Sequence, residues 1–181
     1  MMSYNLGMIP PPAADSPAPV VWEGGSPDDY VGWTLIQASH ALGRHFEALL
    51  GTLGLTPMQF GVLVQLSLQP DLASAELARI VLVTPQSMGE LLSSLERAGL
   101  VERDRNAGPG RRITARVTDA GRAALREATP IVQALNVPDS LGISTEERAL
   151  LNRLLHKVRA AVVDPGFRDR VEARLGRAHP S

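Results

Sequence analysis

The feature that most constrains this 181-residue sequence is the stretch from Ser74 to Gly121. Apolar residues at helical spacing predict a short helix over 74–81 and a second helix that begins after Thr84. Gly99 is expected to end the second helix, because glycine readily adopts the left-handed conformation of a helix C-terminus. The two helices are separated by very few residues, so the pattern predicts a helix-turn-helix.

The residues after this pair predict a small hairpin. A strand is expected from Leu100, a turn over 106–110 and a returning strand over 111–117, before a helix that Thr118 caps. This order of elements is typical of a winged helix-turn-helix, a module that reads DNA. The predicted fold is therefore mainly α with a small, two-stranded β-hairpin wing.

The second helix carries the predicted base contacts. Thr84 suits the N-cap and Pro85 the first helical position. Met88, Leu91, Leu92 and Leu95 recur at helical spacing and should face the core. The outward side offers small polar side chains and a glycine, which suit a helix in a major groove. The candidate DNA-binding residues on it are Thr84, Gln86, Ser87, Gly89, Glu90, Ser93, Ser94 and Arg97. The alternative is an ordinary surface helix.

Arginines flank the turn of the predicted hairpin. Arg105, Arg111 and Arg112 stand on either side of residues 106–110, which are rich in glycine. Arginines at such a tip suit the narrow, electronegative minor groove of DNA. The alternative is that these charges are merely solvated by water.

The net charge of −1 conceals an uneven distribution. Residues 1–78 hold seven acidic residues against Arg44 alone, a net −6, so the rest of the chain carries +5. The segment from Arg97 to Arg122 contains seven arginines and three acidic residues, a net +4. A local basic segment of this kind is typical of a DNA-binding face.

Four sequence stretches, in order, resemble the MarR family (multiple antibiotic resistance regulators). They are residues 55–60 (LTPMQF), 75–78 (AELA), 95–103 (LERAGLVER) and 117–122 (VTDAGR). The resemblance covers residues from about Tyr30 to Val163. It implies a homodimer formed by interlocked first and last helices, and a repressor released by small, often aromatic or anionic, ligands.

The resemblance also implies a ligand pocket between the dimer helices and the DNA-reading unit. The candidate lining residues are Trp33, Gln37, His40, Arg44 and Phe60. They offer an aromatic wall, a titratable group and a cation. The alternative is a polar helix flank that is partly buried at the dimer seam.

The chain is expected to divide as follows. Residues 1–27 form a disordered or extended Pro-rich arm, 28–55 a dimerisation helix, 56–121 the winged helix-turn-helix domain, 122–163 the C-terminal dimerisation helices and 164–181 a tail that is either loose or a short frayed helix. Thr56 and Ser144 begin capping boxes, and Pro130 predicts a kink or break. A broad apolar stripe over 150–162 needs a covering partner, either a second subunit or the rest of its own.

Other chemistry finds little support in the sequence. His40 and His45 are five residues apart, which does not place them on one helix face, and no metal site is expected. No catalytic residues and no cofactor are predicted, and the chain contains no cysteine. No secretion signal or membrane span is recognisable, so the expectation is a cytoplasmic protein with no membrane partner.

These observations predict a homodimeric DNA-binding transcriptional regulator, specifically a repressor that a small ligand releases from a pseudo-palindromic double-stranded operator. Two alternatives stay open at this point. One is a winged-helix module that binds protein instead of DNA, and the other is a DNA-binding regulator without a small-molecule effector.

Overall fold

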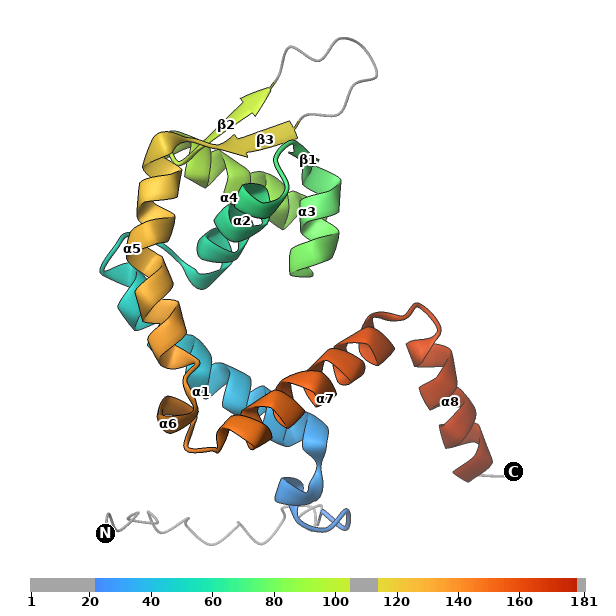
Figure 1. Ribbon diagram of the computed structural model, residues 1–181. Helices are drawn as coiled ribbons and strands as arrows, with labels where there is room; N and C mark the ends of the chain where they lie inside the picture. The colour runs from blue at the N-terminus through green and yellow to red at the C-terminus, as the bar shows by residue number, and fades with distance from the viewer. Residues whose placement is uncertain (1–21, 105–113, 179–181) are drawn as a thin grey trace, which may run out of the picture. The chain divides into compact units, whose positions relative to one another are not determined.

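The computed structural model describes residues 22–104 and 114–178, and Ala41 and Leu42 mark the boundary between two compact units. In chain order the elements are η1 (Pro27–Asp29), α1 (Val31–Gly51), α2 (Pro57–Leu68), β1 (Leu72–Ala73), α3 (Ser74–Val81), α4 (Pro85–Arg97), β2 (Val101–Asp104), β3 (Thr114–Val117), α5 (Asp119–Leu135), α6 (Pro138–Leu141), α7 (Thr145–Val163) and α8 (Phe167–Ala178) (Figure 1). The predicted mainly helical fold with a small wing is confirmed.

The first unit contains an ordered aromatic turn. The Trp22 indole N–H donates to the Gly25 carbonyl at 2.7 Å, and the Tyr30 hydroxyl donates to the Gly24 carbonyl. The two rings meet edge to face with their centroids 6.0 Å apart. The end of the predicted arm is therefore held in a turn by these two hydrogen bonds, and the extended or disordered arm over 1–27 stays a prediction. Residues 1–21 of that predicted arm lie outside the described residues.

Side-chain caps set the starts of the helices in the second unit. The capping box of Thr56 is present, and so is that of Ser144. The Thr84 hydroxyl accepts from the Ser87 N–H at 3.1 Å, with Pro85 in the first turn. The expected start of the DNA-reading helix is therefore confirmed.

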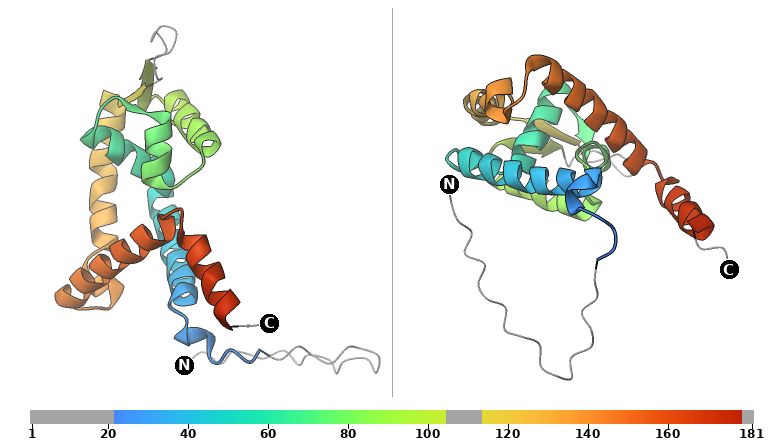
Figure 2. Two further views of the ribbon diagram at one scale, coloured as in Figure 1. Left: turned by 90° about the vertical axis from the view of Figure 1, so that its right-hand side faces the viewer. Right: turned by 90° about the horizontal axis from the view of Figure 1, so that it is seen from below.

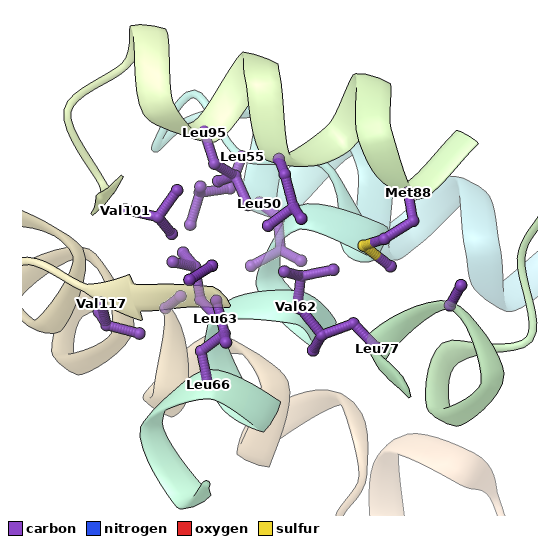
Figure 3. Close-up of a cluster of buried hydrophobic side chains, with 14 residues drawn as sticks. Leu50, Leu55, Val62, Leu63, Leu66, Leu77, Met88, Leu95, Val101 and Val117 are labelled. Carbon is purple, nitrogen blue, oxygen red and sulfur yellow. The ribbon is translucent and has the colours of Figure 1, made fainter. Parts of the chain in front are cut away.

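The core of the second unit lies between α2, α4 and the sheet. Figure 3 shows Met88 and Leu95 of α4 directed toward the side chains of α2, among them Val62 and Leu63. Met88, Leu92 and Leu95 are buried, whereas Leu91 is half-buried. The predicted inward face of α4 is thus essentially correct, and burying it leaves the opposite face for another partner.

The sheet has three antiparallel strands in the order β1-β3-β2, instead of the two predicted. Leu72 pairs with Ala115 and Ala73 pairs with Thr114. The extra strand is only two residues long, so it carries too few residues to show an alternating pattern.

Pro130 does not break α5, which continues from Asp119 to Leu135. Of the two predicted outcomes, the break is wrong and the kink stays a prediction. Ala128, two residues before the proline, is fully buried, and this packing offsets the lost backbone hydrogen bond. In Figures 1 and 2 the helix runs away from the end of β3. The short helix α6 was not predicted.

The C-terminal helices are long but uncovered. None of the residues of α7, all of which lie in the described range, is buried. Its leucines and valines are between 36% and 52% exposed, among them Leu151 at 45% and Leu155 at 36%. α8 forms in the predicted tail, where Arg170 bonds to Asp164 and to the Ala161 carbonyl. That carboxylate also accepts from the Gly166 N–H, so the corner between α7 and α8 is closed by hydrogen bonds.

Candidate nucleic-acid interface

The first two turns of α4 present exposed polar side chains. Gln86 and Glu90 are exposed, and the Gln86 amide donates to the Glu90 carboxylate at 3.4 Å. The Thr84 and Ser87 hydroxyls lie 2.9 Å apart. The positive end of the helix dipole also favours an anion at this end. Here the predicted residues stand together on one solvent-facing surface.

Gly89 lies beside this surface, and no packing in the described part of the subunit requires a glycine there. A Cβ atom added to it would meet nothing within 4 Å. A glycine inside a helix costs roughly 1 kcal/mol relative to alanine. Packing within the subunit therefore does not explain this residue, whereas close approach of an external surface would.

Ser93 and Ser94 hold α4 in place within the subunit. The Ser93 hydroxyl donates to the Gly89 carbonyl at 2.8 Å and accepts from Arg103 at 2.7 Å. The Ser94 hydroxyl accepts from the Gln59 amide at 3.1 Å, which ties α4 to α2. Their predicted DNA contacts stay a prediction, but both hydroxyls already have protein partners. Arg97 is exposed and donates to the Ser93 carbonyl at 3.3 Å.

The tip of the wing, with Arg105, Arg111 and Arg112, lies outside the described residues. At its base, Arg116 of β3 forms a two-point ion pair with Asp71, a residue with a φ of 65°. The hydrogen bonds from Arg116 lower the pKa of the Asp71 carboxyl below its usual value. Sequence reasoning missed this pair because its members are 45 residues apart.

The end of α4 is bonded to the start of α5. Gly99 has a φ of 70°, and its carbonyl accepts from the Thr118 hydroxyl at 2.6 Å. The Thr118 N–H donates to the Leu100 carbonyl at 3.1 Å. A Cβ on Gly121 would lie 2.1 Å from that same carbonyl oxygen, so only glycine fits there. The stretch 118–121 is therefore a junction between the DNA-reading helix and the helix that follows the wing.

Comparison with known proteins identifies the family. A model of the MarR family matches residues 53–112. The HTH-type transcriptional repressor Rv2887 of Mycobacterium tuberculosis (strain ATCC 25618 / H37Rv) is 36% identical over 135 residues, which are 75% of this chain and 97% of the repressor. The chain belongs to the MarR family.

Solved structures of this MarR relative extend the similarity to the fold. The M. tuberculosis Rv2887 complex with salicylic acid has a TM-score of 0.57 at 36% identity, covering 71% of this chain and 96% of that one. Its complex with DNA has a TM-score of 0.58 at 34% identity, with 71% and 97% covered. The resemblance to MarR regulators drawn from the sequence is confirmed.

The predicted MarR ligand pocket is divided between the two compact units. Trp33, Gln37 and His40 belong to the first unit, where all three are exposed. In the second unit Arg44 is exposed, and Phe60 is half-buried and packs against the core. Their assembly into one pocket stays a prediction.

A hollow that sequence reasoning did not predict lies at the base of the MarR wing. It has a volume of about 420 Å³ and is lined by Leu66, Ser67, Pro70, Glu102, Arg116, Val117, Thr118, Asp119 and Arg122. Arg116 is paired with Asp71 and Arg122 with Asp119. Both cations therefore already have carboxylate partners, which weakens their attraction for an anionic ligand.

Within residues 22–104 and 114–178, no helix combines the length and apolar character needed to cross a membrane.

Proposed function

We propose that this protein is a homodimeric transcriptional repressor that binds double-stranded DNA and is released from it by a small aromatic or anionic ligand. Family membership supports the regulator, and the Rv2887 complexes with DNA and with salicylic acid support the two binding activities. The sequence of this chain offers candidate residues for each activity.

The observation that carries the proposal is the exposed surface at the start of α4. Gln86 and Glu90 are exposed beside an unobstructed Gly89, while Met88 and Leu92 on the opposite face are buried. A helix whose apolar face is packed in the core and whose opposite face carries small polar groups can enter a major groove. We assign base contacts to Gln86 and Ser87, and phosphate or minor-groove contacts to Arg105, Arg111 and Arg112.

The dimer is proposed from the exposed state of α7. A helix with Leu151, Leu154, Leu155 and Val158 exposed needs an apolar partner. A second copy would cover these residues and would also place two α4 helices on two half-sites of a pseudo-palindromic operator. The helix α1 is the second proposed dimer element.

For the effector, the chemistry of salicylic acid fits the predicted pocket residues. An aromatic acid needs an apolar wall and a cation, which Trp33, Phe60 and Arg44 supply, while His40 and Gln37 offer hydrogen bonds. The proposed ligand class is therefore a small aromatic carboxylate.

The experiment is a selection of genomic fragments on the purified protein, followed by affinity measurements on the recovered operator and on random duplex DNA. Gln86→Ala should weaken operator binding selectively, because a lost base contact removes discrimination of roughly 1–3 kcal/mol. Gln133→Ala is the matched control, since Gln133 is an exposed glutamine on α5. If no fragment is enriched and binding to heparin is insensitive to salt, the winged helix serves a protein partner instead.

A further inference from the structure

A largely buried arginine joins the first strand of the wing to the DNA-reading helix. The Arg103 side chain of β2 is only 15% exposed, and its carboxylate partner Glu96 of α4 is 28% exposed. Arg103 Nε lies 2.9 Å and Nη2 2.8 Å from the same Glu96 oxygen, Oε2. Nη2 also donates to the Ser93 hydroxyl at 2.7 Å. We call these three residues the Arg103 bridge.

The Arg103 bridge reaches back toward the proposed base-reading surface. The Ser93 hydroxyl, held by Arg103, donates to the Gly89 carbonyl at 2.8 Å. Gly89 follows Gln86 by three residues and directly precedes Glu90 in α4. The Arg103 guanidinium is therefore connected through the Ser93 hydroxyl to the Gly89 carbonyl. Gly89 lies two residues after Ser87, which together with Gln86 is assigned to base contacts.

The geometry suits positioning better than DNA contact. Charge-assisted bonds from a guanidinium fork are strong and directional, and a partly buried pair is screened little by solvent. With its Nε and Nη2 donors directed at Glu96 and Ser93 and its side chain mostly covered, Arg103 is poorly placed to neutralise a phosphate. β2 ends one residue later, at Asp104, where the chain leads into the tip of the wing.

We propose that Arg103 is a positioning residue for DNA recognition. It fixes the wing against α4, so that base contacts by the helix and backbone or minor-groove contacts by the wing form together. The inference rests on the proposed DNA-binding function and adds to it a specificity-determining residue that touches no DNA. It also gives Ser93 a positioning role in place of the predicted DNA contact.

A neighbouring arginine provides the matched control. Arg116 lies on the adjacent strand β3, directly opposite Glu102, and also forms an ion pair. Its side chain is 61% exposed and its partner Asp71 lies before β1, not on α4. Replacing Arg116 removes the same charge from the same sheet without cutting the link to α4.

The test compares Arg103→Gln, Arg103→Lys, Ser93→Ala and Arg116→Gln with the wild-type dimer, using operator and random duplexes at several salt concentrations below the melting temperature of each variant. R103Q should lower the ratio of operator to random affinity by about tenfold, the scale of a coupling between contacting residues. Its salt slope should not change.

R103K should recover part of the ratio, since an ammonium can still pair with Glu96 but lacks the planar fork. S93A should give a smaller loss and keeps the test valid if R103Q does not fold. R116Q should leave the ratio unchanged.

Three results would overturn the inference. Equal weakening on both duplexes, with a salt slope reduced by about 1 per subunit, would make Arg103 a phosphate contact. A lower melting temperature with unchanged discrimination in R103Q and S93A would make the bridge purely structural. An equal loss of discrimination in R116Q would show that the loss comes from removing any positive charge from the sheet, not from breaking the Arg103 bridge. Absence of salt-dependent DNA binding by the wild type is a separate outcome, which overturns the proposed function and this inference with it.

Discussion

At the scale of single residues, side chains that the sequence shows to be polar and solvent-facing have two different roles. Gln86 and Glu90 are exposed, as predicted for a DNA face, whereas Ser93 and Ser94 bond to Arg103 and Gln59. Helical periodicity locates a face to within about one residue, because neighbouring positions differ by 100°. It cannot show that a strand or another helix supplies a donor to one edge of that face. The structure was therefore needed to separate the exposed side chains from those that bond to other elements of the subunit.

Gly89 gives a prediction in which stability and function change in opposite directions. Gly89→Ala should raise the melting temperature by about 2–4 °C, since alanine is favoured in helices by roughly 1 kcal/mol and the added methyl has space. The same methyl should weaken operator binding by standing between α4 and the groove. Thermal melts and operator titrations measure the two effects.

The control for this prediction is Gly61→Ala, at a half-buried glycine in α2 where an added Cβ also meets nothing within 4 Å. It should stabilise the fold without changing DNA affinity. Operator binding by Gly89→Ala that is as tight as wild type would show that DNA does not approach this glycine closely.

At the scale of elements, the sequence predicted the helix starts that depend on neighbouring residues, but not the features that depend on contacts between distant residues. The helices capped by Thr56, Thr84, Thr118 and Ser144 begin where their hydroxyls predict, because a cap depends on residues three apart. β1 was missed because two residues become a strand only through pairing with β3, more than forty residues later. The continuity of α5 through Pro130 was missed for a similar reason, since it depends on tertiary burial.

The ion pair between Asp71 and Arg116 fastens β1 to the wing and gives a pH prediction. Hydrogen bonds from Arg116 hold the folded pKa of Asp71 below its usual value of about 3.9. The stabilisation is therefore fully present above that value and is lost as the pH falls through the lowered folded pKa. Asp71→Asn keeps the positive φ accessible and removes the charge, and it also replaces one of the two oxygens that accept from Arg116 by an amide NH2 group.

The wild type should consequently melt slightly higher than Asp71→Asn at neutral pH, and the two melting temperatures should converge as the pH is lowered below 3.9. Melting curves between neutral and strongly acidic pH would measure this. A difference in melting temperature that stays constant across the whole acid range would show that the carboxylate charge contributes nothing.

At the scale of the whole molecule, the described chain is incomplete as a folded unit. The α7 helix is amphipathic and yet has no buried residue, so a second copy is expected to cover it. Leu151→Glu combined with Leu155→Glu would place unpaired carboxylates in that interface and should dissociate the dimer. Light scattering would report the change of mass.

Asn152→Glu with His156→Glu is the matched control, because it adds the same charges at the same spacing to the other side of α7. This variant should stay dimeric. If the leucine variant keeps the mass of a dimer, the interface lies elsewhere.

The effector response is the second property of the whole molecule. Arg44→Ala should weaken release of the operator by salicylic acid, since a neutral side chain cannot pair with the carboxylate, while DNA affinity without ligand changes little. Arg126→Ala, at an exposed arginine of α5, serves as the control. Titration of the protein–operator complex with salicylic acid measures both variants. Release by salicylic acid at the wild-type concentration in Arg44→Ala would place the acid-binding cation elsewhere.

The hydrogen bonds at 118–121 connect the start of α5 to the residues that follow α4, so a rotation of α5 would be transmitted to α4. The 17 residues of α5 span about 25 Å at 1.5 Å per residue, and Thr118 at its start is bonded to Gly99, two residues after the end of α4. Rotating α5 by about 8° about its C-terminal end displaces its N-terminal end by about 3.5 Å. This displacement is close to the rise of about 3.4 Å between successive bases of one DNA strand. In a two-fold dimer both α5 helices rotate together, so the separation of the two α4 helices shifts by up to two base steps. An effector that rotates α5 by this small angle would therefore put the protein out of step with its operator.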